Sequence, residues 1–157
     1  VKLVELLDEA VERAETLVNA RENDLPDAER KQIALKLGMG AVKFADLSKS
    51  RTSDYIFSWD SMLSFDGATA PYLQYAYTRV SSIFRKADLA VDQLTGTISI
   101  DADAEKALAI KLLQFEEVLD LMVAECTPHV LCSYLYEVAS LYMSFYEACT
   151  ILKEGID

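Results

Sequence analysis

Side chains that can bind a nucleic acid gather in one stretch of the sequence, between Gly67 and Ala87. This stretch has no Asp or Glu, although the chain of 157 residues carries 26 acidic side chains. On a helical wheel of about 100° per residue, one side holds Tyr72, Tyr75, Arg79, Ser82 and Lys86, with Gln74, Thr78 and Arg85 beside them. Tyrosine rings stack on unpaired bases, and arginine and lysine pair with phosphates. The pattern indicates an exposed face that binds single-stranded RNA; a solvated helix face is the alternative interpretation.

The charge is distributed unevenly along the chain. The net charge of -11, taken alone, argues against a polyanionic partner. Residues 1–37 contain 6 basic and 9 acidic side chains, residues 38–86 contain 6 and 4, and residues 87–157 contain 3 and 13. Attraction to phosphates is therefore expected only in the middle stretch, because carboxylates elsewhere repel a polyanion. We expect no DNA partner.

The elements that would position these groups are predicted to be helices. Only 5 Gly and 3 Pro occur, and residues that favour helices dominate the composition. We expect an all-α helical bundle with at most one short extended segment, at residues 54–59. The hydrophobic periodicity predicts helices over residues 1–18, 27–37, 69–87, 104–126 and 128–153, with shorter pieces at 41–47 and 60–65.

Cap and turn residues set the expected boundaries of these helices. Gly38 and Gly40 are expected to interrupt the second helix. Thr69 is predicted to be the N-cap of helix 69–87, with Pro71 in its first turn, where a missing N–H costs little. This helix and the last two predicted helices are expected to pack together. The first helix starts without a polar lead-in, which suggests a cut through a longer protein.

Other kinds of chemistry have little support in the sequence. The three cysteines and the single histidine have no spacing that suits zinc, and we interpret all three thiols as buried core residues: Cys126, Cys132 and Cys149. We predict no metal site. No apolar run approaches the roughly 18 to 20 residues that a membrane span needs, and no signal-peptide core is present. A cytoplasmic protein without a membrane partner is expected.

Two long stretches of the sequence are similar to one enzyme family. The first is GMGAVKFADLSKSRTSDYIF at residues 38–57, continued by SWDSMLSFDGATAPYLQYAYTR at residues 58–79. The second is PHVLCSYLYEVA at residues 128–139, continued by FYEAC at residues 145–149. Both resemble arginyl-tRNA synthetases, which are class I aminoacyl-tRNA synthetases, and the similarity runs along nearly the whole chain. The second stretch resembles the signature helix of their DALR-type anticodon-binding domain.

The resemblance implies a division of the chain and a function. Residues 1–66 would form a helical layer that links the catalytic and anticodon-binding domains, and residues 67–157 would form the anticodon-binding domain, without its last helix. The family's catalytic Rossmann domain would precede this fragment. The fragment would then bind arginine tRNA with no catalytic residue and no cofactor of its own. The full-length ligase would join arginine to its tRNA using ATP and magnesium.

The resemblance also implies which residues contact tRNA. Tyr146 is the first candidate for a base contact. A second group of candidates shares the helix 69–87: Tyr72, Gln74, Tyr75, Arg79 and Lys86. Candidates for contact with the tRNA stem are Lys43, Lys49 and Arg51. The segment LSKSR at residues 47–51 is similar to the family's ATP signature, but it lies downstream of that loop and has no companion signature, so we do not interpret it as an ATP site.

The last predicted helix leaves an alternative function open. Apolar residues cover well over half of its circumference, which is more than one neighbouring helix can bury. Margin residues such as Tyr136 and Met143 would pack against a further helix or stay exposed because a covering element is missing. An acidic helical domain that binds a protein partner or itself is therefore the alternative to RNA binding. For the RNA-binding fragment we expect a monomer.

Overall fold

The structure is a computed structural model that describes residues 2–20 and 25–152, and these residues form helices joined by loops, with no β-strand. The elements are α1 (Leu3–Asn19), α2 (Asp27–Leu47), α3 (Trp59–Met62), α4 (Ala70–Ala87), a 3-10 turn (Val91–Gln93), α5 (Asp103–Leu113), α6 (Phe115–Glu125) and α7 (Pro128–Ala148). The predicted all-α fold is confirmed. Residues 54–58, within the expected extended segment, form an irregular loop.

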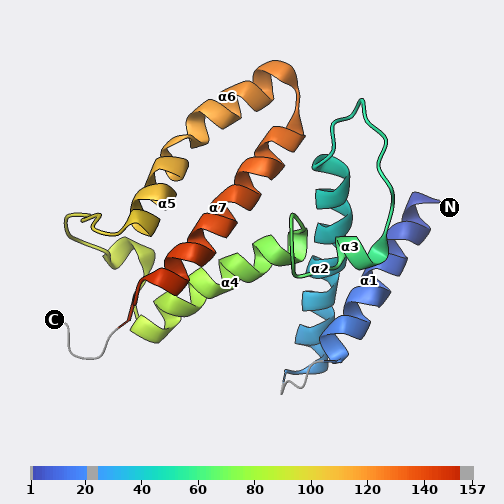
Figure 1. Cartoon of the computed structure of the whole chain (residues 1–157). Helices are drawn as coiled ribbons and strands as arrows, with labels where there is room; N and C mark the ends of the chain where they lie inside the picture. Colours follow the sequence, from blue (N-terminus) through green and yellow to red (C-terminus); the bar gives the residue numbers. More distant parts are fainter. Residues whose placement is uncertain (1, 21–24, 153–157) are drawn as a thin grey trace.

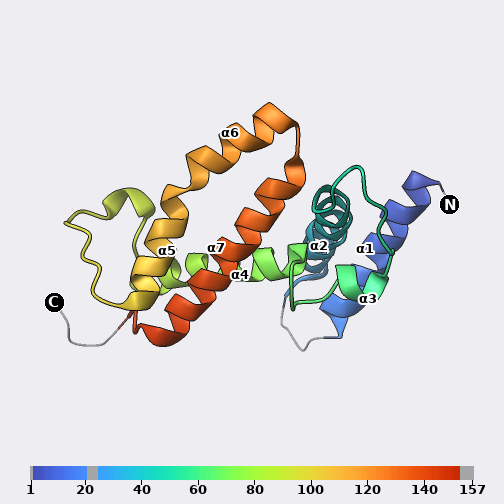
Figure 2. The same cartoon turned by 45° about the horizontal axis from the view of Figure 1, so that its top comes forward.

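The helices form two groups that α4 connects (Figure 1). At one end α1 and α2 lie side by side as an antiparallel pair, with the short α3 against them. At the other end α5 and α6 follow one another along α7 (Figure 2). Helix α4 contacts α2 near its start and α7 along its length, which confirms the expected packing of helix 69–87 against the last predicted helix, whereas α5 and α6 pack mainly against α7. The molecule is therefore an elongated arrangement in which α4 is the crossing element.

Small residues allow α1 and α2 to pack closely. Ala10, Ala14 and Ala34 are fully buried in this contact. A Cβ atom added to Gly38 would lie 2.6 Å from the carbonyl oxygen of Ala10, which is too close for any side chain. The prediction that glycines interrupt this helix was wrong, because α2 continues to Leu47. Gly38 provides space for a neighbouring backbone, and the packing compensates for its low helix propensity.

The start of α4 is built as the sequence predicts. The Thr69 hydroxyl accepts a hydrogen bond from the backbone N–H of Tyr72 at 3.2 Å and donates one to the carbonyl of Ser64 at 2.7 Å. Pro71 lies in the first turn and is buried. Gln74 ties the helix to α2, because its side-chain amide donates to the carbonyl of Lys36 at 3.0 Å. These contacts fix the direction in which α4 leaves the α1–α2 pair.

The sequence predicted one helix over residues 104–126, but the structure has two helices in this range, so the prediction of a continuous helix was wrong. A break at Gln114 separates α5 from α6 and lets them bend along α7. The buried Tyr134 of α7 lies at the break, and its hydroxyl is 3.1 Å from the carbonyl of Lys111 and 3.4 Å from that of Leu112. A tertiary hydrogen bond therefore satisfies carbonyls in the last turn of α5. Helix α7 ends at Ala148, earlier than predicted, because Cys149 has an extended backbone.

Candidate nucleic-acid interface

A cluster of one arginine and two tyrosines joins α4 to α7. The Nε of Arg79 donates a hydrogen bond to the Tyr75 hydroxyl at 2.7 Å. The guanidinium carbon of Arg79 lies 4.8 Å from the ring centroid of Tyr75 and 4.8 Å from that of Tyr146. All three side chains are half-buried. Three residues that the sequence places on two separate helices are therefore in direct contact, and we call them the Arg79 cluster.

Tyr142 supports the Arg79 cluster from α7. Its ring centroid lies 6.1 Å from that of Tyr146 and 6.3 Å from that of Phe145. Its hydroxyl is buried and has no hydrogen-bond partner among the residues that the structure describes. Burial raises the pKa of this hydroxyl, the neighbouring Tyr146 raises it further, and the positive charge of Arg79 acts in the opposite direction. The Tyr142 hydroxyl therefore stays neutral near pH 7, where an ordinary tyrosine is also protonated.

The face of α4 that the sequence predicted to be exposed is partly covered by α7. The ring of Tyr72 lies 5.6 Å from that of Tyr136, and its hydroxyl is 3.5 Å from the Ser140 hydroxyl oxygen. Tyr72, Tyr75 and Arg79 are half-buried, so the prediction of full exposure was wrong. The wide apolar arc of α7 explains this result, because it extends far enough to accept the tyrosines of α4.

The exposed side of α4 carries other groups. Lys86 is exposed in the last turn together with Arg85, where positive charge also complements the helix dipole. Tyr77 is 72% exposed and was not among the residues predicted from the sequence to contact RNA. The sequence could have indicated this exposure, because Tyr77 is an aromatic residue that falls in neither the apolar stripe nor the polar face of an acid-free helix. Gln74, by contrast, points to α2 and lies apart from the Arg79 cluster.

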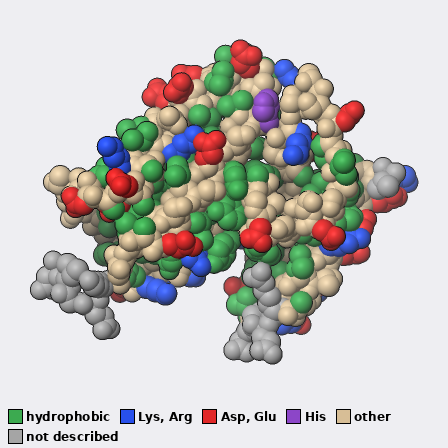
Figure 3. All heavy atoms as spheres, viewed as in Figure 1, with side chains coloured by type: hydrophobic (Ala, Val, Ile, Leu, Met, Phe, Trp, Pro, Cys, Tyr) green, Lys and Arg blue, Asp and Glu red, His purple; other side chains and the backbone are tan. Residues whose placement is uncertain are grey.

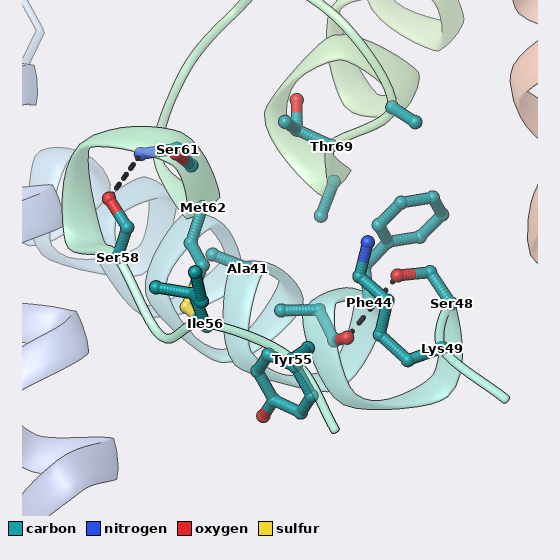
Figure 4. Close-up of a pocket in the computed structure, with 13 residues that line it drawn as sticks. Ala41, Phe44, Ser48, Lys49, Tyr55, Ile56, Ser58, Ser61, Met62 and Thr69 are labelled. Atoms are coloured by element: carbon teal, nitrogen blue, oxygen red, sulfur yellow. Dashed lines mark hydrogen bonds between the residues drawn. The ribbon is translucent and has the colours of Figure 1, made fainter. Parts of the chain in front are cut away.

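The three candidates for stem contact lie at the other end of α4. Lys43 is exposed on α2, and Lys49 is exposed just after it. The Arg51 guanidinium donates to the carbonyl of Glu125 at 3.4 Å, so the loop after α2 touches the end of α6. Lys49 borders a hollow beside the start of α4 (Figure 4). The structure therefore separates these cations from the Arg79 cluster along the length of α4.

Charged side chains of both signs are spread over the face of the molecule in Figure 3. Carboxylates lie over α6 at the top of the view and basic side chains lie at the lower edge, where α4 ends, but some Lys and Arg side chains also lie among the carboxylates of the upper half. Apolar side chains fill the space between α7 and its neighbours. Because residues 67–87 carry no acid and residues 87–157 carry 13 acidic and 3 basic side chains, a polyanion is expected to be repelled less near α4 than over α5 and α6.

The described residues provide few ligands for metals and no membrane segment. No group of three or more His, Cys, Asp or Glu among them could hold a metal ion. None of the described helices is both long and apolar enough to cross a bilayer. Of the three thiols, Cys132 is buried, Cys149 is half-buried and Cys126 is exposed, so the prediction of three buried thiols was wrong. Cys126 ends α6 in a left-handed conformation, which places it at the surface.

The geometry of the bundle agrees with the comparison to known families. A family model described as the DALR anticodon binding domain matches residues 73–156, which is more than half of the chain. The chain belongs to this anticodon-binding family. A second model, described as the catalytic domain of tRNA synthetases class I (R), matches residues 1–59. The division expected at residues 66 and 67 lies between the two matches and stays a prediction.

Two relatives of this chain are named as arginine–tRNA ligases. The chain is 68% identical to the arginine–tRNA ligase of Pseudoalteromonas atlantica and 65% identical to that of Pseudoalteromonas translucida, over all 157 residues in both cases. It spans about 27% of the length of each relative.

Two solved structures share the fold. The arginyl-tRNA synthetase of Thermus thermophilus superposes with a TM-score of 0.81 and 34% identity, over 99% of this chain and 25% of that one. The Plasmodium falciparum enzyme superposes with a TM-score of 0.87 and 33% identity, over 98% and 28%. The resemblance to arginyl-tRNA synthetases that the motifs indicated is confirmed.

Proposed function

We propose that this chain binds arginine tRNA as the anticodon-recognising part of an arginine–tRNA ligase. The observation that carries the proposal is the Arg79 cluster, in which Tyr75 and Tyr146 are held together by one cation in a chain of the anticodon-binding family. Tyrosine rings are sequence-tolerant platforms for unpaired bases. An anticodon presents unpaired bases in a loop, which is the form of RNA that proteins read by stacking and hydrogen bonding.

The geometry suggests a role for each member of the cluster. Arg79 contacts both rings, so it holds them at a fixed separation and adds positive charge beside them. Tyr146 packs against the ring of Tyr142. Because this contact already restricts the Tyr146 side chain, less entropy is lost when a base stacks on the Tyr146 ring. Lys86, exposed near the end of α4, would pair with a phosphate of the same loop. In this proposal the chain recognises RNA and does not catalyse the ligation.

The activity of the longer protein is also part of this proposal. Relatives more than three times as long are named arginine–tRNA ligases. We infer that the complete protein attaches arginine to tRNA in the cytoplasm with ATP and magnesium, and that residues outside this chain hold both. A module for protein interaction or self-association, the alternative function, gains no support from the comparisons, because the relatives named above are tRNA ligases and the matching models are synthetase domains.

Substitution of Tyr146 tests the proposal. Tyr146→Ala removes a stacking platform worth about 1–3 kcal/mol, so we expect the dissociation constant for arginine tRNA to rise at least fivefold. Tyr146→Phe keeps the ring and is expected to bind almost as well as the unsubstituted chain. Ile98→Ala, at a loop residue that is 88% exposed, serves as the control. Binding is measured by fluorescence anisotropy, and helicity by circular dichroism. Equal affinity of Tyr146→Ala and Ile98→Ala, with helicity intact, would refute the role of Tyr146.

A further inference from the structure

Tyr142 carries a polar group that the proposed function does not use. Its hydroxyl oxygen is buried and has no hydrogen-bond partner among the described residues. Most buried hydroxyls in folded proteins are paired, and one without a partner lowers the stability of the fold. A phenylalanine would keep the ring without this cost. The unpaired hydroxyl is explained if it gains a partner in another state of the chain.

The guanidinium of Arg79 has hydrogen-bond donors that are not used. It has five N–H groups, and its Nε–H donates to the Tyr75 hydroxyl at 2.7 Å. Within the part of the chain that the structure describes, its two Nη atoms have no hydrogen-bond acceptor and no carboxylate partner. Arg79 and Tyr142 both lie against the ring of Tyr146. Unused donors and an unused acceptor therefore flank one ring.

Arg79 occupies a face of the Tyr146 ring on which a base could stack. The guanidinium carbon lies 4.8 Å from the centroid of this ring, which is a cation–π contact. The Tyr142 ring packs beside the same ring, at 6.1 Å between centroids and 49° between planes. A base that takes the face held by Arg79 must displace the guanidinium. The displaced group loses its contact with Tyr146 and needs another partner.

We infer that Tyr142 is a positioning residue for RNA binding: its hydroxyl accepts a hydrogen bond from the Arg79 guanidinium when a base stacks on the Tyr146 ring. The inference rests on the proposed function and describes how its site opens. The Nε–H of Arg79 can keep its bond to Tyr75 while an Nη–H turns to Tyr142, because the donors of a guanidinium point in several fixed directions. Binding of the base then pairs a hydroxyl that the free chain leaves unpaired.

Tyr142→Phe tests this inference because it removes only the hydroxyl oxygen. The free variant should melt about 3 °C higher than the unsubstituted chain, since an unpaired buried group is lost. Its affinity for arginine tRNA should be about tenfold weaker, since a hydrogen bond to a charged group is lost from the complex. The slope of log affinity against log salt should not change, because no phosphate contact is removed. Melting is followed by circular dichroism and binding by fluorescence anisotropy.

Tyr134→Phe is the matched control on the same helix. The Tyr134 hydroxyl is already paired in the free chain, because it lies 3.1 Å from the carbonyl of Lys111. This variant should therefore melt at a lower temperature and bind arginine tRNA as the unsubstituted chain does. The same chemical change at two tyrosines of α7 thus has opposite expected effects on stability.

A double variant tests whether Tyr142 acts through Arg79. Lysine cannot bond the hydroxyls of Tyr75 and Tyr142 in the same geometry, so in an Arg79→Lys chain the further change Tyr142→Phe should weaken binding less than about twofold. Losses of affinity that multiply in the double variant would contradict a role through Arg79.

The outcomes separate the inference from the proposed function. If the unsubstituted chain does not bind arginine tRNA, the proposed function fails and the inference fails with it. If it binds and Tyr142→Phe binds equally well, only the inference fails. A lower melting temperature of Tyr142→Phe, like that expected for Tyr134→Phe, would show that the hydroxyl is paired in the free chain and would also overturn the inference.

Discussion

At the scale of single residues, Arg79 determines how the candidate interface is organised. Its guanidinium contacts two rings and hydrogen-bonds the hydroxyl of one of them, a combination that needs a flat group with several fixed donors. The sequence identified Tyr75, Arg79 and Tyr146 as candidates separately. It could not show that they touch, because the contact depends on how α4 crosses α7. Periodicity describes the face of one helix and not the helix that covers it.

Arg79→Lys tests whether the guanidinium positions the rings or only supplies charge. Lysine keeps the positive charge but cannot contact both rings and donate to Tyr75 in the same geometry. Cation–π contacts contribute about 0.5–2 kcal/mol, so we expect tRNA binding about tenfold weaker, with an unchanged salt slope. Lys86→Arg, which exchanges the same groups in reverse at an exposed residue, should alter affinity less than about twofold. Equal binding by Arg79→Lys and the unsubstituted chain would contradict the positioning role.

At the scale of elements, helix boundaries that depend on residues of the same segment could be predicted from the sequence. Helix boundaries that depend on contact with another helix could not. The Thr69 cap and the limits of α4 follow from local chemistry, and the structure confirms them. The continuation of α2 past Gly38 depends on contact with α1, and the break at Gln114 accompanies a contact with Tyr134. A glycine within a helical sequence pattern can indicate either the end of the helix or a close contact with a neighbouring backbone. The sequence of one helix cannot distinguish them.

Two glycines in α2 provide a matched test of this packing. Alanine at Gly38 would meet the backbone of Ala10 at 2.6 Å. A backbone cannot move aside easily, so we expect Gly38→Ala to lower the free energy of unfolding by about 1–3 kcal/mol. Alanine at Gly40 would come too close only to the side-chain amide of Gln74, at 2.7 Å, because the Ala70 Cβ lies at an ordinary contact distance of 3.5 Å. That group can shift, and alanine favours the helix by about 1 kcal/mol. The net change for Gly40→Ala should therefore stay within about 1 kcal/mol in urea denaturation. Equal losses for both variants would contradict this account.

At the scale of the whole molecule, the negative charge and the exposed apolar surface of the C-terminal half have opposite effects on self-association. Residues 87–157 carry 3 basic and 13 acidic side chains, a balance of -10. The same half exposes large apolar side chains on α5 and α6, and Leu113 is 83% and Val123 70% exposed. Apolar exposure favours association, whereas a strong charge of one sign keeps copies apart. Because this charge repulsion acts against association, we expect the chain to be a monomer although its surface is partly apolar.

This balance predicts association that depends on salt. At about 0.1 M salt the Debye length is about 10 Å, and repulsion between two acidic bundles is effective; at about 1 M salt it falls to about 3 Å. We therefore expect sedimentation equilibrium to show a monomer at low salt and a growing dimer fraction at high salt. Leu113→Glu should remain monomeric in both conditions, because it adds charge and removes apolar surface on α5. Leu3→Glu, at an exposed leucine of α1, should associate as the unsubstituted chain does. A stable dimer already present at low salt would instead favour self-association as a function of this surface.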